Sequence, residues 1–117
     1  MIDYERLEVY QCALEFVRRP LPLRETAGAK GNGDLFDQFR RASLSVVLNI
    51  AEGAGKVRQP DKQRFYAISR GAAYECAALL DLFSLLGILQ PEQKQEAKSL
   101  LHRIISMLSV LSRQERS

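Results

Sequence analysis

The stretch that decides the fold covers residues 45–75 and reads SVVLNIAEGAGKVRQPDKQRFYAISRGAAYE. Apolar residues recur at helical spacing on both sides of a short basic turn, which predicts a hairpin of two helices. Asn49 and Glu52 lie among apolar residues such as Val46 and Ile50. Buried polar groups are costly unless they are paired. We therefore expect their partners on the neighbouring helix.

The pairing across this hairpin follows from its centre. If the turn is centred near Arg58, facing residues have numbers that sum to about 116. The predicted facing pairs are Arg41 with Glu75, Ser45 with Gly71, and Glu52 with Arg64. Both charged pairs have opposite signs. A mid-helix glycine costs about 1 kcal/mol relative to alanine, so we expect Gly71 to permit a close approach of the two helices.

These polar residues form a predicted structural ladder. Its members are Arg41, Ser45, Asn49, Glu52, Gly71 and Glu75. The first four are spaced by four, four and three residues and therefore share one helix face. Buried pairs of this kind fix the register of two helices more than they stabilise them, because desolvation offsets the attraction.

Prolines and glycines divide the whole chain into four predicted helices. The expected ranges are about 4–18, 34–55, 60–86 and 91–114, with a flexible loop at 20–33 that contains two prolines and three glycines. Apolar residues in the last range alternate steps of four and three, the spacing of left-handed bundle packing. The sequence predicts an all-α fold: one domain over residues 1–117, arranged as an antiparallel up-down-up-down four-helix bundle.

The third predicted helix is apolar nearly all round. Its expected inner stripe comprises Phe65, Ile68, Ala72, Leu79, Phe83 and Leu86. Between residues 72 and 89 the only charged side chains are Glu75 and Asp81. Three partner helices cannot enclose such a helix completely, so we predict a self-association surface on its C-terminal half. The alternative is an unusually apolar core helix.

Composition and charge set the class of protein. The chain has 117 residues, 46% of them hydrophobic, and a net charge of +3. We expect a cytoplasmic protein, since acidic residues interrupt the N-terminus and no uncharged apolar run reaches the roughly 18 residues of a membrane span. Cys12 and Cys76 lie on different predicted helices, and we expect buried thiols.

Positive charge gathers around the predicted turn. Residues 56–70 hold five basic residues and one acid, a local balance of +4. The candidate nucleic-acid-binding residues are Lys56, Arg58, Lys62 and Arg64. A basic end of this kind suits an anionic partner, although a solvated turn would look the same.

The sequence lacks two motifs that are common in enzymes, the phosphate-binding loop and the di-iron site. Residues 53–56 read GAGK, but the upstream glycine and the following Ser/Thr of a phosphate-binding loop are replaced by Ile50 and Val57. His102 is the only histidine, and residue 99 before it is serine, so a di-iron Glu-x-x-His motif is excluded. We predict no catalytic residues, no metal and no cofactor.

The element Asn49–Gly53, with Arg40-Arg41-Ala42 and Ser45 before it and Gly71 and Glu75 after it, resembles one protein family. This is the bacterial four-helix-bundle family of the 23S rRNA gene intervening sequences, and the resemblance covers nearly the whole chain. The family is similar to the accessory protein of diversity-generating retroelements, which implies a ring-shaped homopentamer with a positively charged, nucleic-acid-binding surface. The chain departs from the family pattern at Ala72, where serine is common, and in the loop at 20–33.

Two functions remain open at this stage. The first is a non-enzymatic oligomer that binds RNA or DNA through the basic turn. The second is a protein-interaction scaffold that docks an acidic partner on the same turn, with further contacts from the 20–33 loop. A weaker third possibility is an enzyme that uses Glu52 or Glu75.

Overall fold

The computed structural model describes residues 3–19 and 23–113. These residues form one short 3-10 helix and five α-helices, and no strand occurs among them. The elements are η1 (Asp3–Arg6), α1 (Glu8–Arg18), α2 (Leu23–Ala29), α3 (Gly33–Ala54), α4 (Gln59–Leu85) and α5 (Pro91–Arg113). The prediction of an all-α fold is confirmed.

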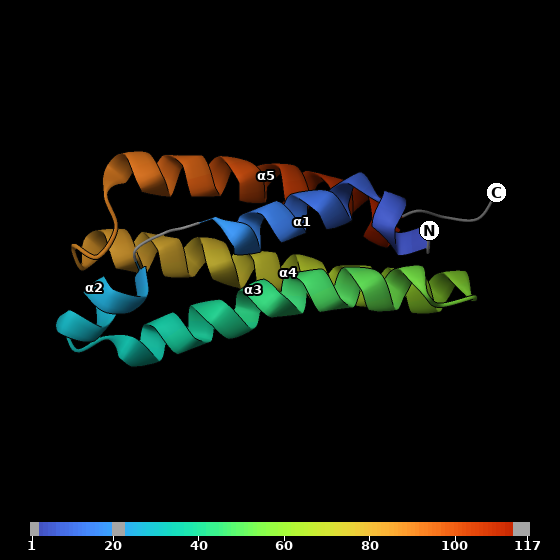
Figure 1. Ribbon diagram of the computed structural model, residues 1–117. Helices are drawn as coiled ribbons and strands as arrows, with labels where there is room; N and C mark the ends of the chain where they lie inside the picture. Colours follow the sequence, from blue (N-terminus) through green and yellow to red (C-terminus); the bar gives the residue numbers. More distant parts are fainter. Residues whose placement is uncertain (1–2, 20–22, 114–117) are drawn as a thin grey trace.

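The four longer helices lie side by side along the molecule, which measures 50 × 23 × 19 Å (Figure 1). α3 packs along α4, α4 packs along α5, and α1 rests against both α3 and α5. Successive long helices run in opposite directions (Figure 1). The turn between α3 and α4 lies at one end of the molecule, and α2 lies at the other.

The prediction of a flexible loop at 20–33 is wrong for most of its length. Residues 23–29 form α2, while residues 20–22 lie outside the described residues. Leu23 and Ala27 are spaced by four residues and are both buried, so this short helix covers the core with one face. Gly31 ends the segment with φ +77°, in the left-handed region that favours glycine. Because the segment is rich in proline and glycine, its helix of seven residues was not predicted from the sequence.

The other helix boundaries fall within a few residues of prediction. The first helix begins later than the predicted residue 4, because Leu7 is extended (φ −70°, ψ 125°) and separates η1 from α1. α3 and α4 each begin one residue earlier than expected. Pro60 lies in the first turn of α4, where its missing N–H costs nothing. Gly87, with φ +73°, lies two residues beyond Leu85, the last residue of α4.

The core is built from one face of each long helix. On α3 the buried residues include Phe39, Val46 and Ile50. On α4 the predicted stripe is wrong in its first half. The buried positions there are Tyr66, Ser69, Ala73, Cys76, Leu79, Leu80 and Phe83, whereas Ile68 and Leu86 are exposed. Leu79 and Phe83 are buried as predicted, so the offset of one residue, or roughly 100°, is confined to the first half of the helix.

The C-terminal half of α4 keeps large apolar side chains at the surface. Leu82 and Leu86 are about two-fifths exposed, and Leu85 is 80% exposed. Tyr74 is also exposed. The expectation that neighbouring helices leave part of this helix uncovered is therefore confirmed.

None of the helices in residues 3–19 and 23–113 combines the length and the apolarity that crossing a membrane requires.

Candidate nucleic-acid interface

The candidate interface is the tip of the α3–α4 hairpin. α3 ends at Ala54, and the backbone N–H of Gly55 donates to the carbonyl of Ala51 at 3.1 Å. Arg58 has extended backbone torsions (φ −80°, ψ 135°) and precedes the first residue of α4. Three of the four predicted nucleic-acid-binding residues flank this turn closely, and Arg64 lies two residues beyond Lys62 on α4.

Lys62 is occupied within the hairpin. Its Nζ donates to the carbonyl oxygens of Ala54 at 2.9 Å and Gly53 at 3.4 Å. These carbonyls lie at the C-terminus of α3, where the helix dipole favours a cation. Lys62 is accordingly half-buried and caps the preceding helix. Its role in the described structure is architectural.

Lys56 and Arg64 both approach Phe65. The Nζ of Lys56 lies 5.0 Å from the centre of the Phe65 ring, and the guanidinium carbon of Arg64 lies 5.7 Å from it. Both distances fall within the roughly 6 Å of a cation–π contact. Lys56 also forms an ion pair with Glu52 at 3.2 Å, which offsets its charge. Arg64 has no ion pair with any described residue.

Arg58 and Arg64 therefore supply the uncompensated charge at the tip. Both side chains are exposed, and the guanidinium group of Arg58 has neither an ion pair nor a hydrogen bond with any described residue. Val57, immediately before Arg58, is 94% exposed. The tip thus presents two guanidinium groups and one apolar side chain to a partner. Guanidinium groups suit the oxygens of phosphate or carboxylate.

The predicted ladder across the hairpin does not form, and its pairs require correction. Glu52 pairs with Lys56, one turn away on its own chain segment, and does not pair with Arg64. Arg41 and Glu75 are both exposed, and no ion pair joins them within residues 3–19 and 23–113. They line a shallow surface hollow between α3 and α4.

The amide and hydroxyl members of the ladder bond within α3. The Nδ2 of Asn49 donates to the carbonyl oxygen of Ser45 at 2.9 Å and approaches the Ser45 hydroxyl at 3.0 Å. Asn49 and Ser45 are half-buried. Their hydrogen bonds are therefore satisfied one turn away, and no partner on α4 is needed.

The prediction that Gly71 permits a close approach of the two helices is wrong. The close approach occurs at Gly53 instead. A β-carbon added at Gly71 would meet no atom within 4 Å, so no close approach occurs there. A β-carbon at Gly53 would lie 2.9 Å from Cε1 of Tyr66, a ring that is 5% exposed. The close approach of α3 and α4 is thus located near the tip, at a glycine one residue before the end of α3.

Hydroxyl groups that sequence reasoning missed lie in the seam between α3 and α4. The hydroxyl of Ser69 donates to the carbonyl of Val46 at 2.7 Å, and both residues are fully buried. The hydroxyl of Ser43 donates to the carbonyl of Phe39 at 2.8 Å and lies 3.6 Å from the Sγ of Cys76. One signal could have found Ser69, because it belongs to the heptad series 66, 69, 73, 76, 80 and 83.

Buried titratable groups in this seam stay neutral. Burial raises the pKa of the Cys76 thiol to about 11 from its ordinary 9.0, and burial also raises the pKa of Tyr66. Cys12 and Cys76 are both buried free thiols, as expected. Among the residues that the structure describes, no cluster of three His, Cys, Asp or Glu side chains could hold a metal ion.

Comparison with known protein families identifies the class to which this chain belongs. The profile of the 23S rRNA-intervening sequence protein family matches residues 5–110. The chain therefore belongs to that family, as the elements around Asn49–Gly53 indicated. A search of the curated proteins returned no significant match.

Proposed function

We propose that this chain is a non-enzymatic, cytoplasmic homo-oligomer that binds the backbone of RNA or DNA through the tip of the α3–α4 hairpin. In this proposal α1, α3, α4 and α5 form an antiparallel up-down-up-down four-helix bundle, and α2 is an insertion at its far end. The observation that carries the proposal is the exposure of Arg58 and Arg64 at one end of the molecule without an acidic partner among the described residues.

The contacts of the tip favour backbone binding without sequence preference. Phosphate contacts by arginine position a nucleic acid but read no bases. Base stacking requires exposed aromatic rings. Tyr66 is buried, and Phe65 is half-buried and already covered by two cations. We expect affinity that falls steeply with salt and differs little between unrelated sequences.

Self-association would multiply these contacts. The outer face of the α3–α4 hairpin exposes Leu48 (66%) on α3 and Ile68, Leu82 and Leu85 on α4. Isolated exposed apolar residues are ordinary, but several along adjacent helices are typical of an interface. Gly71 lies on this face in mid-helix and has no intramolecular reason for its small size. A second copy packed closely over Gly71 would supply that reason. The family resemblance favours a homopentamer, which would present five tips together.

A salt series tests the nucleic-acid proposal. Fluorescence anisotropy with unrelated RNA and DNA duplexes should show that the Arg58→Gln/Arg64→Gln double variant binds more weakly and has a shallower dependence on salt. Loss of two phosphate contacts lowers the slope of log K against log salt by about 1.8 on B-DNA. The matched control is Arg24→Gln/Lys30→Gln, an equal loss of charge among exposed residues at the opposite end. Equal slopes for all three proteins would contradict the proposal.

Sedimentation equilibrium tests the oligomer separately. Leu48→Asp places a charge on the exposed outer face and should yield monomers with unchanged helix content. Nucleic-acid affinity should then fall as well, since linked sites raise avidity by about 10²–10⁴. A Leu48→Asp protein of unchanged mass would show that this face does not mediate assembly.

The exposed Val57 favours a second candidate function, a scaffold that docks an acidic protein partner. An apolar side chain between Lys56 and Arg58 suits a surface that is both apolar and acidic. Val57→Ser distinguishes the two functions, because it should leave phosphate binding unchanged and weaken protein docking. Absence of nucleic-acid binding at low salt would favour the scaffold.

A further inference from the structure

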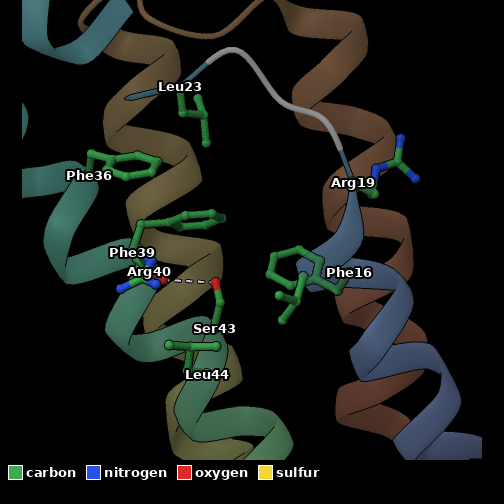
Figure 2. A pocket seen from close by; sticks show the side chains of 9 residues that line it. Phe16, Arg19, Leu23, Phe36, Phe39, Arg40, Ser43 and Leu44 are labelled. Carbon is green, nitrogen blue, oxygen red and sulfur yellow. Dashed lines mark hydrogen bonds between the residues drawn. The ribbon is translucent and has the colours of Figure 1, made fainter. Parts of the chain in front are cut away.

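A separate pocket lies away from the hairpin tip, between the C-terminal end of α1, the start of α2 and the first half of α3 (Figure 2). Its volume is 260 Å³. An apolar cavity of about 150 Å³ already holds benzene, and ordinary ligand pockets begin near 300 Å³. The pocket therefore has the size for a single ring or a short aliphatic chain.

The floor of the pocket is apolar. Phe16, Leu23 and Phe39 line it and are all buried. Figure 2 shows Phe16 on α1 facing Phe39 on α3, and their ring centres lie 5.8 Å apart. The hydroxyl of Ser43 also lines the pocket but already donates to the carbonyl of Phe39. The buried surface thus suits an apolar body.

The rim combines exposed apolar groups with one available cation. Val17 and Leu44 line the pocket and are about two-fifths exposed. Arg19 pairs with Glu96 of α5 at 2.5 Å, so its charge is compensated. Arg40 also lines the pocket and is exposed, and its guanidinium group has no ion pair or hydrogen bond with any described residue. One guanidinium group is therefore free to bind an anion at the mouth.

One guanidinium group beside an apolar floor favours a ligand with one negative charge and an apolar body. A planar carboxylate can accept two parallel hydrogen bonds from arginine. A phosphate dianion would keep an uncompensated charge next to apolar walls, which is unfavourable. We propose that this pocket binds a small hydrophobic carboxylic acid, with its apolar body among Phe16, Leu23 and Phe39 and its carboxylate paired with Arg40. This inference is independent of the proposed nucleic-acid function.

The test is an NMR titration of the full chain with 3-phenylpropionate and with its neutral analogue 3-phenylpropionamide. The acid should cause saturable shifts of backbone amides at residues 16–17, 23 and 36–44, with a dissociation constant at least about tenfold lower than that of the amide. Arg40→Gln should remove that difference. Val17→Phe, which fills the mouth from an exposed rim position, should abolish binding of both compounds while the fold remains intact.

Arg41→Gln is the matched control, because Arg41 is the adjacent exposed arginine but lines the hollow between α3 and α4. It should bind the acid as the natural chain does. Equal affinity for acid and amide would overturn the proposal. So would shifts confined to residues 56–64, which would report nonspecific anion binding at the basic tip, or no saturable shift at millimolar concentrations.

Discussion

Both faces of the α3–α4 hairpin carry small and polar residues, but only those on the inner face join the two helices. The inner face joins the helices through small groups: Gly53 against the Tyr66 ring, and the Ser69 hydroxyl on the carbonyl of Val46. The outer face carries Arg41, Glu75, Gly71 and exposed leucines that make no comparable contact between the two helices. Register alone therefore does not identify the seam of a helix pair. The rotation of each helix decides which side chains enter it.

The largest effect should come from truncation of the inner face of α4. Phe83→Ala removes a fully buried ring and should lower the free energy of unfolding by about 3–5 kcal/mol in urea denaturation. Leu85→Ala, two residues along the same helix and 80% exposed, should change it by less than about 0.5 kcal/mol. A similar loss for both variants would mean that the faces are assigned incorrectly.

Gly53, near the C-terminus of α3, and Gly71, in the middle of α4, should respond to alanine substitution with opposite signs. Gly53→Ala places a β-carbon against the buried Tyr66 ring and should destabilise the chain by about 1–2 kcal/mol. Gly71→Ala meets no atom within 4 Å and should stabilise the isolated subunit by up to about 1 kcal/mol through helix propensity. Measured in dilute protein, stabilisation by Gly53→Ala would contradict the location of the close approach. Weakened assembly of Gly71→Ala at higher concentration would support the proposed interface.

A double-mutant cycle on Arg41 and Glu75 sharpens the comparison further. Since no ion pair joins these exposed side chains, the coupling energy between Arg41→Glu and Glu75→Arg in the monomer should lie within about 0.3 kcal/mol of zero. Chemical denaturation of the two single variants and the double variant gives this value. A favourable coupling above about 1 kcal/mol would restore the ladder that the sequence suggested.

The smallest effect should be the pH response of Asp81, which links α4 to α5. Hydrogen bonds from Lys98 and Lys94 lower the pKa of this exposed carboxyl group. The carboxylate is therefore favoured in the folded state. Its contribution to stability is present above the unfolded pKa of about 3.9 and is lost as pH falls through the lower folded value.

Denaturation of Asp81→Asn at pH 7 and near pH 2 checks this sign. The variant should be slightly less stable than the natural chain at neutral pH and equal to it in acid. Glu75→Gln, which removes an exposed carboxylate without an ion-pair partner among the described residues, is the control. A loss for Asp81→Asn that grows in acid would contradict the assignment.

Most of the fold could be predicted from the sequence, whereas the site could be predicted only in part. Helix ends were predictable because Pro60, Gly87 and Pro91 act on the local backbone. The α2 helix was missed because burial of Leu23 and Ala27 overrides a weak local preference. The basic tip was located correctly, but the engagement of Lys62 with two carbonyls and of Lys56 with Glu52 depends on side-chain geometry.

By itself, the sequence determined an all-helical chain, the ends of its main helices, the basic hairpin tip and membership of the family. These properties follow from hydrophobic periodicity and from backbone limits that act over a few residues. Tertiary structure alone decided which face of the first half of α4 is buried, and with it the choice of Ser69 and Gly53 for the seam. A shift of one residue turns a helix by only about 100°, and for an apolar helix such as α4 several faces are almost equally suited to burial. Packing against α3 and α5 selects among them.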